Sequence, residues 1–69
     1  MEIKDFAELT GSKIEKGNFI IEDKNYFSIP ANRITEIRQN PVWKSSYYVN
    51  TDIRGLFIEW TGECFQITF

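Results

Sequence analysis

Residues 56–69 read Leu-Phe-Ile-Glu-Trp-Thr-Gly-Glu-Cys-Phe-Gln-Ile-Thr-Phe. Apolar side chains recur at every second position on both sides of the Gly62-Glu63 pair, and most are aromatic or β-branched. This alternation places successive side chains on opposite faces of a strand, and a glycine between two such runs is typical of a hairpin turn. The stretch therefore predicts a β-hairpin. Its second strand, Cys64–Phe69, lies either at a sheet edge or between two strands, for example beside residues 18–22.

A second hairpin is predicted nearer the N-terminus. Asn18–Glu22 and Tyr26–Ile29 are apolar runs, and the residues between them, Asp23-Lys24-Asn25, have the composition of a turn. The inward positions of this hairpin are Phe19, Ile21, Phe27 and Ile29. A further strand is expected at Tyr47–Thr51, and the residues that follow it, 52–55, form a turn into the last hairpin.

The first residues of the chain predict a short helix over residues 3–10. Ile3, Phe6 and Ala7 recur at helical spacing, and Gly11 supplies a stop. A helix of about two turns is not stable alone and must pack on an apolar surface. We therefore expect an α+β fold, with a short N-terminal helix packed on a curved antiparallel sheet of about five strands.

Residues 31–38 fit two structures. Pro30 suits the first turn of a helix, and Ile34 and Ile37 are three positions apart. The β-branched content of Ile34–Arg38 favours a bulged strand instead, which is the interpretation we prefer. Either element ends at Asn40-Pro41, because proline disfavours helix in the preceding residue. Residues 42–46 then form a loop or the start of a strand.

Tyr26–Ile37 resembles a strand pair of small pleckstrin-homology-like bacterial domains. In that family an aromatic-rich strand runs into an Ile-Pro pair, here Ile29-Pro30, and then into a strand with isoleucines three positions apart. The resemblance implies a strand over residues 31–38. The helix that closes the barrel of that family has no predicted counterpart here, because the last residues form the hairpin.

Composition narrows the classes of function. The chain has 69 residues, enough for one domain, residues 1–69. It carries no histidine and one cysteine, Cys64, so neither an internal disulfide nor a typical zinc site is expected. The net charge is −2, which is unlike the strongly basic surface of a dedicated DNA-binding domain. No targeting segment or membrane span is evident, and we expect a cytoplasmic protein with no membrane association.

No residues suggest catalysis. Cys64 has no base near it in sequence, and an acidic neighbour and apolar surroundings disfavour a reactive thiolate. Glu59 and Glu63 flank the hairpin turn and form the only candidate carboxylate pair, but charges at this place commonly keep an apolar hairpin soluble. We expect a protein that is not an enzyme and has no cofactor or metal.

The residues that suggest binding are cations and aromatic side chains between positions 33 and 54. They are Trp43, Lys44, Tyr47, Tyr48 and Arg54, with Arg33 and Arg38 as supporting charges. Tryptophan, tyrosine and arginine dominate protein interfaces, so we predict an adaptor or inhibitor that docks on a larger protein. The chain is also similar in type to small accessory proteins of phages and mobile elements. The alternatives are that these residues serve only the core and surface, or that they bind single-stranded nucleic acid. A homodimer through the last strand is a separate prediction.

Overall fold

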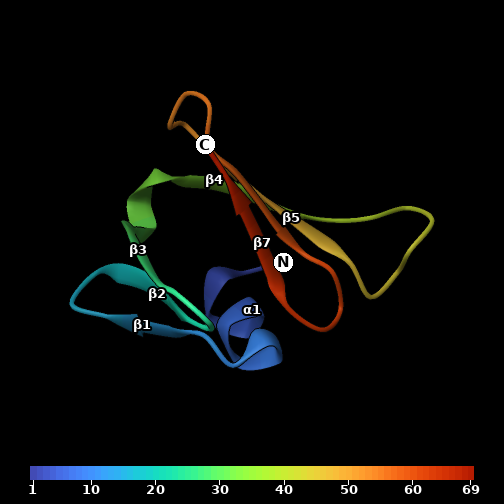
Figure 1. The fold of residues 1–69 in the computed structure, drawn as a ribbon, viewed down its shortest axis with the longest axis horizontal. Coiled ribbons are helices and arrows are strands. Elements are labelled where there is room, and N and C mark those ends of the chain that lie inside the picture. The colour runs from blue at the N-terminus through green and yellow to red at the C-terminus, as the bar shows by residue number, and fades with distance from the viewer.

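The computed structural model describes all residues, 1–69, and has the predicted α+β fold with a short N-terminal helix (Figure 1). The strands form two antiparallel sheets, with three strands in the order β1-β2-β3 and four in the order β4-β5-β6-β7, and they do not close into a barrel. No helix is long and apolar enough to cross a membrane. The elements in chain order are α1 (Ile3–Thr10), β1 (Lys13–Glu15), β2 (Asn18–Glu22), β3 (Tyr26–Pro30), the 3-10 helix η1 (Ala31–Arg33), β4 (Ile34–Gln39), β5 (Tyr47–Thr51), β6 (Phe57–Trp60) and β7 (Phe65–Thr68).

Helix α1 has the bounds that the sequence predicts. Gly11 follows it with φ of 76°, a left-handed conformation that glycine adopts without steric cost. Its buried residues are Phe6 and Ala7, and Phe6 has no exposed surface at all. The helix is therefore held by the apolar face that it buries, as expected for an element of only eight residues.

Strand β1 was missed by the sequence analysis. It has three residues, all of them exposed, so it lacks the apolar alternation that reveals a strand. It pairs with β2 through a tight turn at Lys16-Gly17, where both residues have positive φ. Lys13 also forms an ion pair with Glu22 at 2.6 Å. The hydrogen bond from Lys13 to that carboxylate raises the lysine pKa above its ordinary value.

Residues 31–38 combine the two structures that the sequence left open. Pro30 precedes a single 3-10 turn, η1, and the chain then continues as strand β4. The register between β4 and β5 shifts between Ile34 and Glu36, which is the predicted bulge. The preferred interpretation, a bulged strand, is confirmed over Ile34–Gln39, whereas Ala31–Arg33 are helical. Residues 41–46 form a loop, and β5 follows as predicted.

The core lies between the two sheets and the helix. The ring of Phe65 in β7 lies 6.0 Å from that of Phe6 and 6.3 Å from that of Phe19 in β2, so it joins all three layers. Trp60 covers Phe65 at a centroid distance of 5.0 Å. The inward side chains of the last hairpin thus belong to the core, and no buried side-chain polar atom lacks a hydrogen-bond partner. On the other side of the four-stranded sheet, the outward face is exposed, with Tyr48 and Phe57 among its residues.

Candidate binding surface

The outer face of the four-stranded sheet carries a row of side chains, one from each strand. The strand register places Arg38 beside Tyr48, Tyr48 beside Glu59, and Glu59 beside Gln66. Neighbours of this kind have Cβ atoms about 5 Å apart and can contact a ligand together. The row mixes one cation, one anion and two neutral groups, so its charge is balanced.

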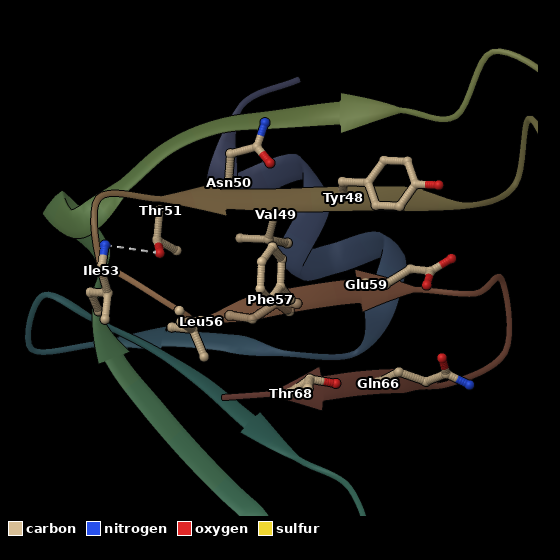
Figure 2. A pocket seen from close by; sticks show the side chains of 12 residues that line it. Tyr48, Val49, Asn50, Thr51, Ile53, Leu56, Phe57, Glu59, Gln66 and Thr68 are labelled. Carbon is tan, nitrogen blue, oxygen red and sulfur yellow. Dashed lines mark hydrogen bonds between the residues drawn. The ribbon is translucent and has the colours of Figure 1, made fainter.

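A shallow hollow of about 540 Å³ lies over β5, β6 and β7 on this face (Figure 2). Figure 2 shows Tyr48, Glu59 and Gln66 at one end of it, and the turn that contains Ile53 at the other. Phe57 stands on this face with 69% of its surface exposed, although it lies within a strand pairing. An apolar ring surrounded by hydrogen-bonding side chains is a typical anchor point for a binding partner.

The loop between β4 and β5 projects from the body of the protein (Figure 1). Its tip exposes two apolar residues, Val42 at 74% and Trp43 at 71%. The loop is nevertheless held at its base by Asn40, which is buried. The Asn40 carboxamide oxygen accepts hydrogen bonds from the backbone N–H groups of Val42 and Trp43, at 2.8 and 2.9 Å. The tryptophan is therefore presented on an ordered backbone.

The same loop is joined to the outer face of the sheet. The Asn40 amide nitrogen donates to the Tyr48 hydroxyl at 3.0 Å, and the Ser46 hydroxyl donates to a Glu59 carboxylate oxygen at 3.2 Å. The Gln39 side chain also donates to the carbonyl of Lys44 at 2.7 Å. We call the loop 40–46 and the adjoining outer-face residues Arg38, Tyr48 and Phe57 the loop-and-sheet surface.

The structure divides the seven residues that the sequence proposed for binding. Trp43, Lys44, Tyr48 and Arg38 lie on the loop-and-sheet surface and are exposed. Arg33 and Arg54 lie at the opposite end of β5, where Arg33 forms an ion pair with Asp52 at 2.5 Å. The seven residues therefore do not form one continuous patch.

Tyr47 belongs to the core instead of the surface. It is only 9% exposed, and its ring contacts that of Phe6 edge to face at a centroid distance of 5.7 Å. The physical reason is the alternation of β5, which turns Tyr47 and Val49 inward while Tyr48 and Asn50 face outward. A role for the Tyr47 side chain in direct binding is inconsistent with this position.

Sequence reasoning did not identify Asn40, Val42 and Phe57, which the structure brings into the loop-and-sheet surface. The alternation of the last hairpin already put Phe57 on the face opposite Ile58, but gave no sign of whether that face was covered. Asn40 carried a signal as well, because Asn followed by Pro is common where a side chain accepts hydrogen bonds from a turn. Val42 had no distinguishing pattern.

The two carboxylates of the candidate pair, Glu59 and Glu63, line different hollows. Glu59 lines the hollow on the outer face, whereas Glu63 lines a different hollow with Thr10 and Gly11 of the helix end. Cys64 is exposed, and its sulfur lies 3.7 Å from the hydroxyl of Thr61. No three residues of the types that bind metals lie together.

Comparisons with protein-family models, with curated proteins and with solved structures each found no match.

Proposed function

We propose that this protein is a non-enzymatic binding protein that docks on a larger protein through the loop-and-sheet surface. The observation that supports the proposal is the exposure of Val42 and Trp43 on a loop whose backbone is fixed by Asn40. Association normally costs free energy for ordering side chains and loops. A tryptophan that is already presented on an ordered loop avoids part of that cost, and tryptophan is among the residues most enriched in binding hot spots.

The charges of the surface favour a protein over a nucleic acid. Arg38 and Lys44 supply two cations, but Glu36 and Glu59 lie on the same sheet face and would repel phosphates. Single-stranded nucleic-acid binding depends on neutralising phosphates, and it weakens steeply as salt rises. A surface of balanced charge around exposed rings fits a protein interface of mixed polarity. An inhibitor of a larger assembly in the cytoplasm, encoded by a phage or mobile element, is our concrete form of this proposal.

The test is the substitution Trp43→Ala with Tyr26→Ala as its matched control. Tyr26 is 68% exposed on β3, in the other sheet from the strands that flank the loop, so its removal deletes a comparable exposed ring outside the surface. The partner is first identified by affinity capture and mass spectrometry, and its affinity for each purified variant is then measured by calorimetry. Hot-spot truncation costs about 2 kcal/mol or more, so Trp43→Ala should weaken binding by about 30-fold and Tyr26→Ala should not.

Two results would contradict the proposal. Equal affinities of the Trp43→Ala variant and the unsubstituted protein for the partner would show that the loop is not part of the interface. Binding of oligonucleotides that disappears with rising salt and is lost in Trp43→Ala would assign the surface to nucleic acid instead. Tyr48→Ala should be used without any change at Tyr47, because Tyr47 is a core residue and its removal would unfold the protein.

The homodimer predicted from the sequence concerns another surface. Strand β7 has β6 on one side and no strand on the other, so it lies at an edge of the four-stranded sheet. We keep self-association through this edge as part of the proposal, because an unpaired strand edge can add a strand from a second chain.

A further inference from the structure

We infer that β7 pairs with β7 of a second copy, antiparallel and about a twofold axis at Ile67, to give one continuous sheet of eight strands. The inference rests on the self-association just proposed and specifies its register. The two sheets leave four strand edges open, those of β1, β3, β4 and β7.

Three of these edges carry features that discourage pairing with another chain. β1 is only three residues long and has Lys13 and Glu15 at its ends. β3 ends in Pro30, which has no backbone N–H to donate. β4 has the bulge after Ile34 and carries charged residues. Short length, charge, proline and bulges are the usual means by which proteins block edge pairing.

The edge of β7 is also short, with four residues, but it has no charge, proline or bulge. Residues 64–69 contain no charged side chain, no proline and no glycine, and the pairing of β7 with β6 runs without a register shift. The strand is therefore open to another strand in a way that the other three are not. This contrast within one small protein distinguishes β7 from an ordinary sheet edge.

The hydrogen-bond pattern of the hairpin formed by β6 and β7 shows which backbone groups of β7 face away from β6. The backbone N–H of Thr61 donates to the carbonyl of Cys64 at 2.9 Å, which sets these two residues at a hydrogen-bonded position of the ladder, and the Cys64 N–H donates to the Thr61 hydroxyl. Bonded and non-bonded pairs alternate along an antiparallel ladder, which directs the backbone groups of Gln66 and Thr68 toward β6. The N–H and C=O groups of Phe65 and Ile67 consequently point to the open side of β7.

The sequence of this edge is symmetric about Ile67. Residues 65–69 read Phe-Gln-Ile-Thr-Phe, so a twofold axis at Ile67 sets Phe65 opposite Phe69 of the second copy. The same axis sets Gln66 opposite Thr68 of the second copy, on the polar outer face. The axis pairs Phe65 with Phe69 and Ile67 with Ile67 through hydrogen bonds. The alternation along the strand directs the backbone groups of these same residues to the open side of β7. Apolar residues meet apolar ones, and no like-charged side chains are opposed.

A groove lies beside β7. It has a volume of about 210 Å³ and is lined by Ile21, Phe65 and Ile67 together with the turn between β2 and β3. Phe69 stacks on Phe27 at a centroid distance of 6.1 Å but is largely exposed. In the dimer, Phe69 of each copy would lie beside Phe65 of the other, at the mouth of this groove, and would lose that exposure.

Two charge variants test the register. The first double variant, Gln66→Lys with Thr68→Lys, places a lysine of one copy opposite a lysine of the other at each end of the paired strands. The second, Gln66→Lys with Thr68→Glu, places a lysine opposite a glutamate at the same positions. Both substitutions are on the outer face, and the lysine introduced in place of Gln66 lies beside Glu59 in either variant, so this contact within the monomer is matched. We expect the Lys/Glu variant to dimerise about tenfold more tightly than the Lys/Lys variant at low salt.

Sedimentation equilibrium from about 10 µM to about 1 mM measures these affinities. A mass that stays monomeric for the unsubstituted protein over this range would overturn the inference, and so would equal affinities of the two variants.

A second measurement needs no substitution. In a mixture of labelled and unlabelled protein, isotope-filtered nuclear Overhauser spectra should show contact between the Hα protons of Gln66 and Thr68 of different copies, because such non-bonded pairs have Cα atoms about 4.5 Å apart. Both experiments use the isolated protein, so a failure here leaves the test of Trp43 and the larger partner unaffected.

Discussion

Replacing Asn40 by alanine should both destabilise the protein and release the loop that presents Trp43. The Asn40 side chain makes three hydrogen bonds, two accepted from backbone N–H groups and one donated to the Tyr48 hydroxyl. Each is worth about 0.5–1.5 kcal/mol net. The loop N–H groups can reach water once the side chain is gone, so we expect the lower part of the summed range, about 2 kcal/mol.

This loss is large relative to the free energy of unfolding of the whole protein. A domain of this size has a free energy of unfolding of about 3–10 kcal/mol. Asn40→Asp is the matched control, because it keeps an oxygen that accepts from both loop N–H groups, while the Tyr48 hydroxyl can turn and donate to the new carboxylate. We expect the aspartate variant to lose less than about 1 kcal/mol.

Urea unfolding followed by circular dichroism measures the stability, and the backbone ¹⁵N–¹H heteronuclear Overhauser effect of Val42 and Trp43 measures the order of the loop. The alanine variant should show a lower unfolding midpoint and reduced values at these two amides. A loss below about 0.5 kcal/mol with unchanged amide values would refute the claim that Asn40 holds the loop. If the loop docks on a partner, the alanine variant should also bind more weakly, although Asn40 itself is buried.

Two further substitutions test the core and the last turn. Phe6→Ala removes a ring with no exposed surface that contacts three other rings, so it should cost about 3–5 kcal/mol and leave little or no folded protein in a thermal melt. A loss below about 1 kcal/mol would show that the ring is not packed as described. Gly62→Ala should destabilise more than Gly11→Ala, by about 1 kcal/mol, in urea unfolding. Both glycines have positive φ, but only at Gly62 would the added Cβ approach another group, the Ser45 hydroxyl at 3.0 Å. Equal losses for the two variants would contradict this packing of Ser45.

Local patterns were sufficient for most of the fold. The helix over residues 3–10 and the strands beginning at Tyr26 and Tyr47 were predicted because each buries one face, and the periodicity of the apolar residues records which face. The strand beginning at Asn18 buries Phe19, Ile20 and Ile21, and its continuous apolar run indicated it. Strand β1 could not be found this way because none of its residues is buried. The division of the strands into two sheets was also not predicted, since it depends on contacts between distant residues such as Phe65 and Phe19.

The binding surface was harder to predict, and the reason lies in Tyr47 and Tyr48. The two neighbours have the same side chain and the same propensity for an interface, yet one is buried against Phe6 and the other faces solvent. Alternation separated them onto two faces, but only the tertiary structure shows which face the helix covers. Arg33 and Arg54 were grouped with Trp43 because they are close to it in sequence, and the length of β5 separates them.

In strand β7 the side chains and the backbone face different surroundings. The side chains of Phe65 and Ile67 pack against the core, so their conspicuous apolar character is explained by the fold. Their backbone N–H and C=O groups do not take part in the pairing with β6, because the alternation of hydrogen bonds along the hairpin directs them away from that strand. An apolar edge strand without charge, proline or a bulge is prone to pair with another chain, and β7 is the only one of the four edges that lacks all three features. Pairing with a second copy satisfies the free groups of Phe65 and Ile67 and leaves the core contacts of their side chains unchanged.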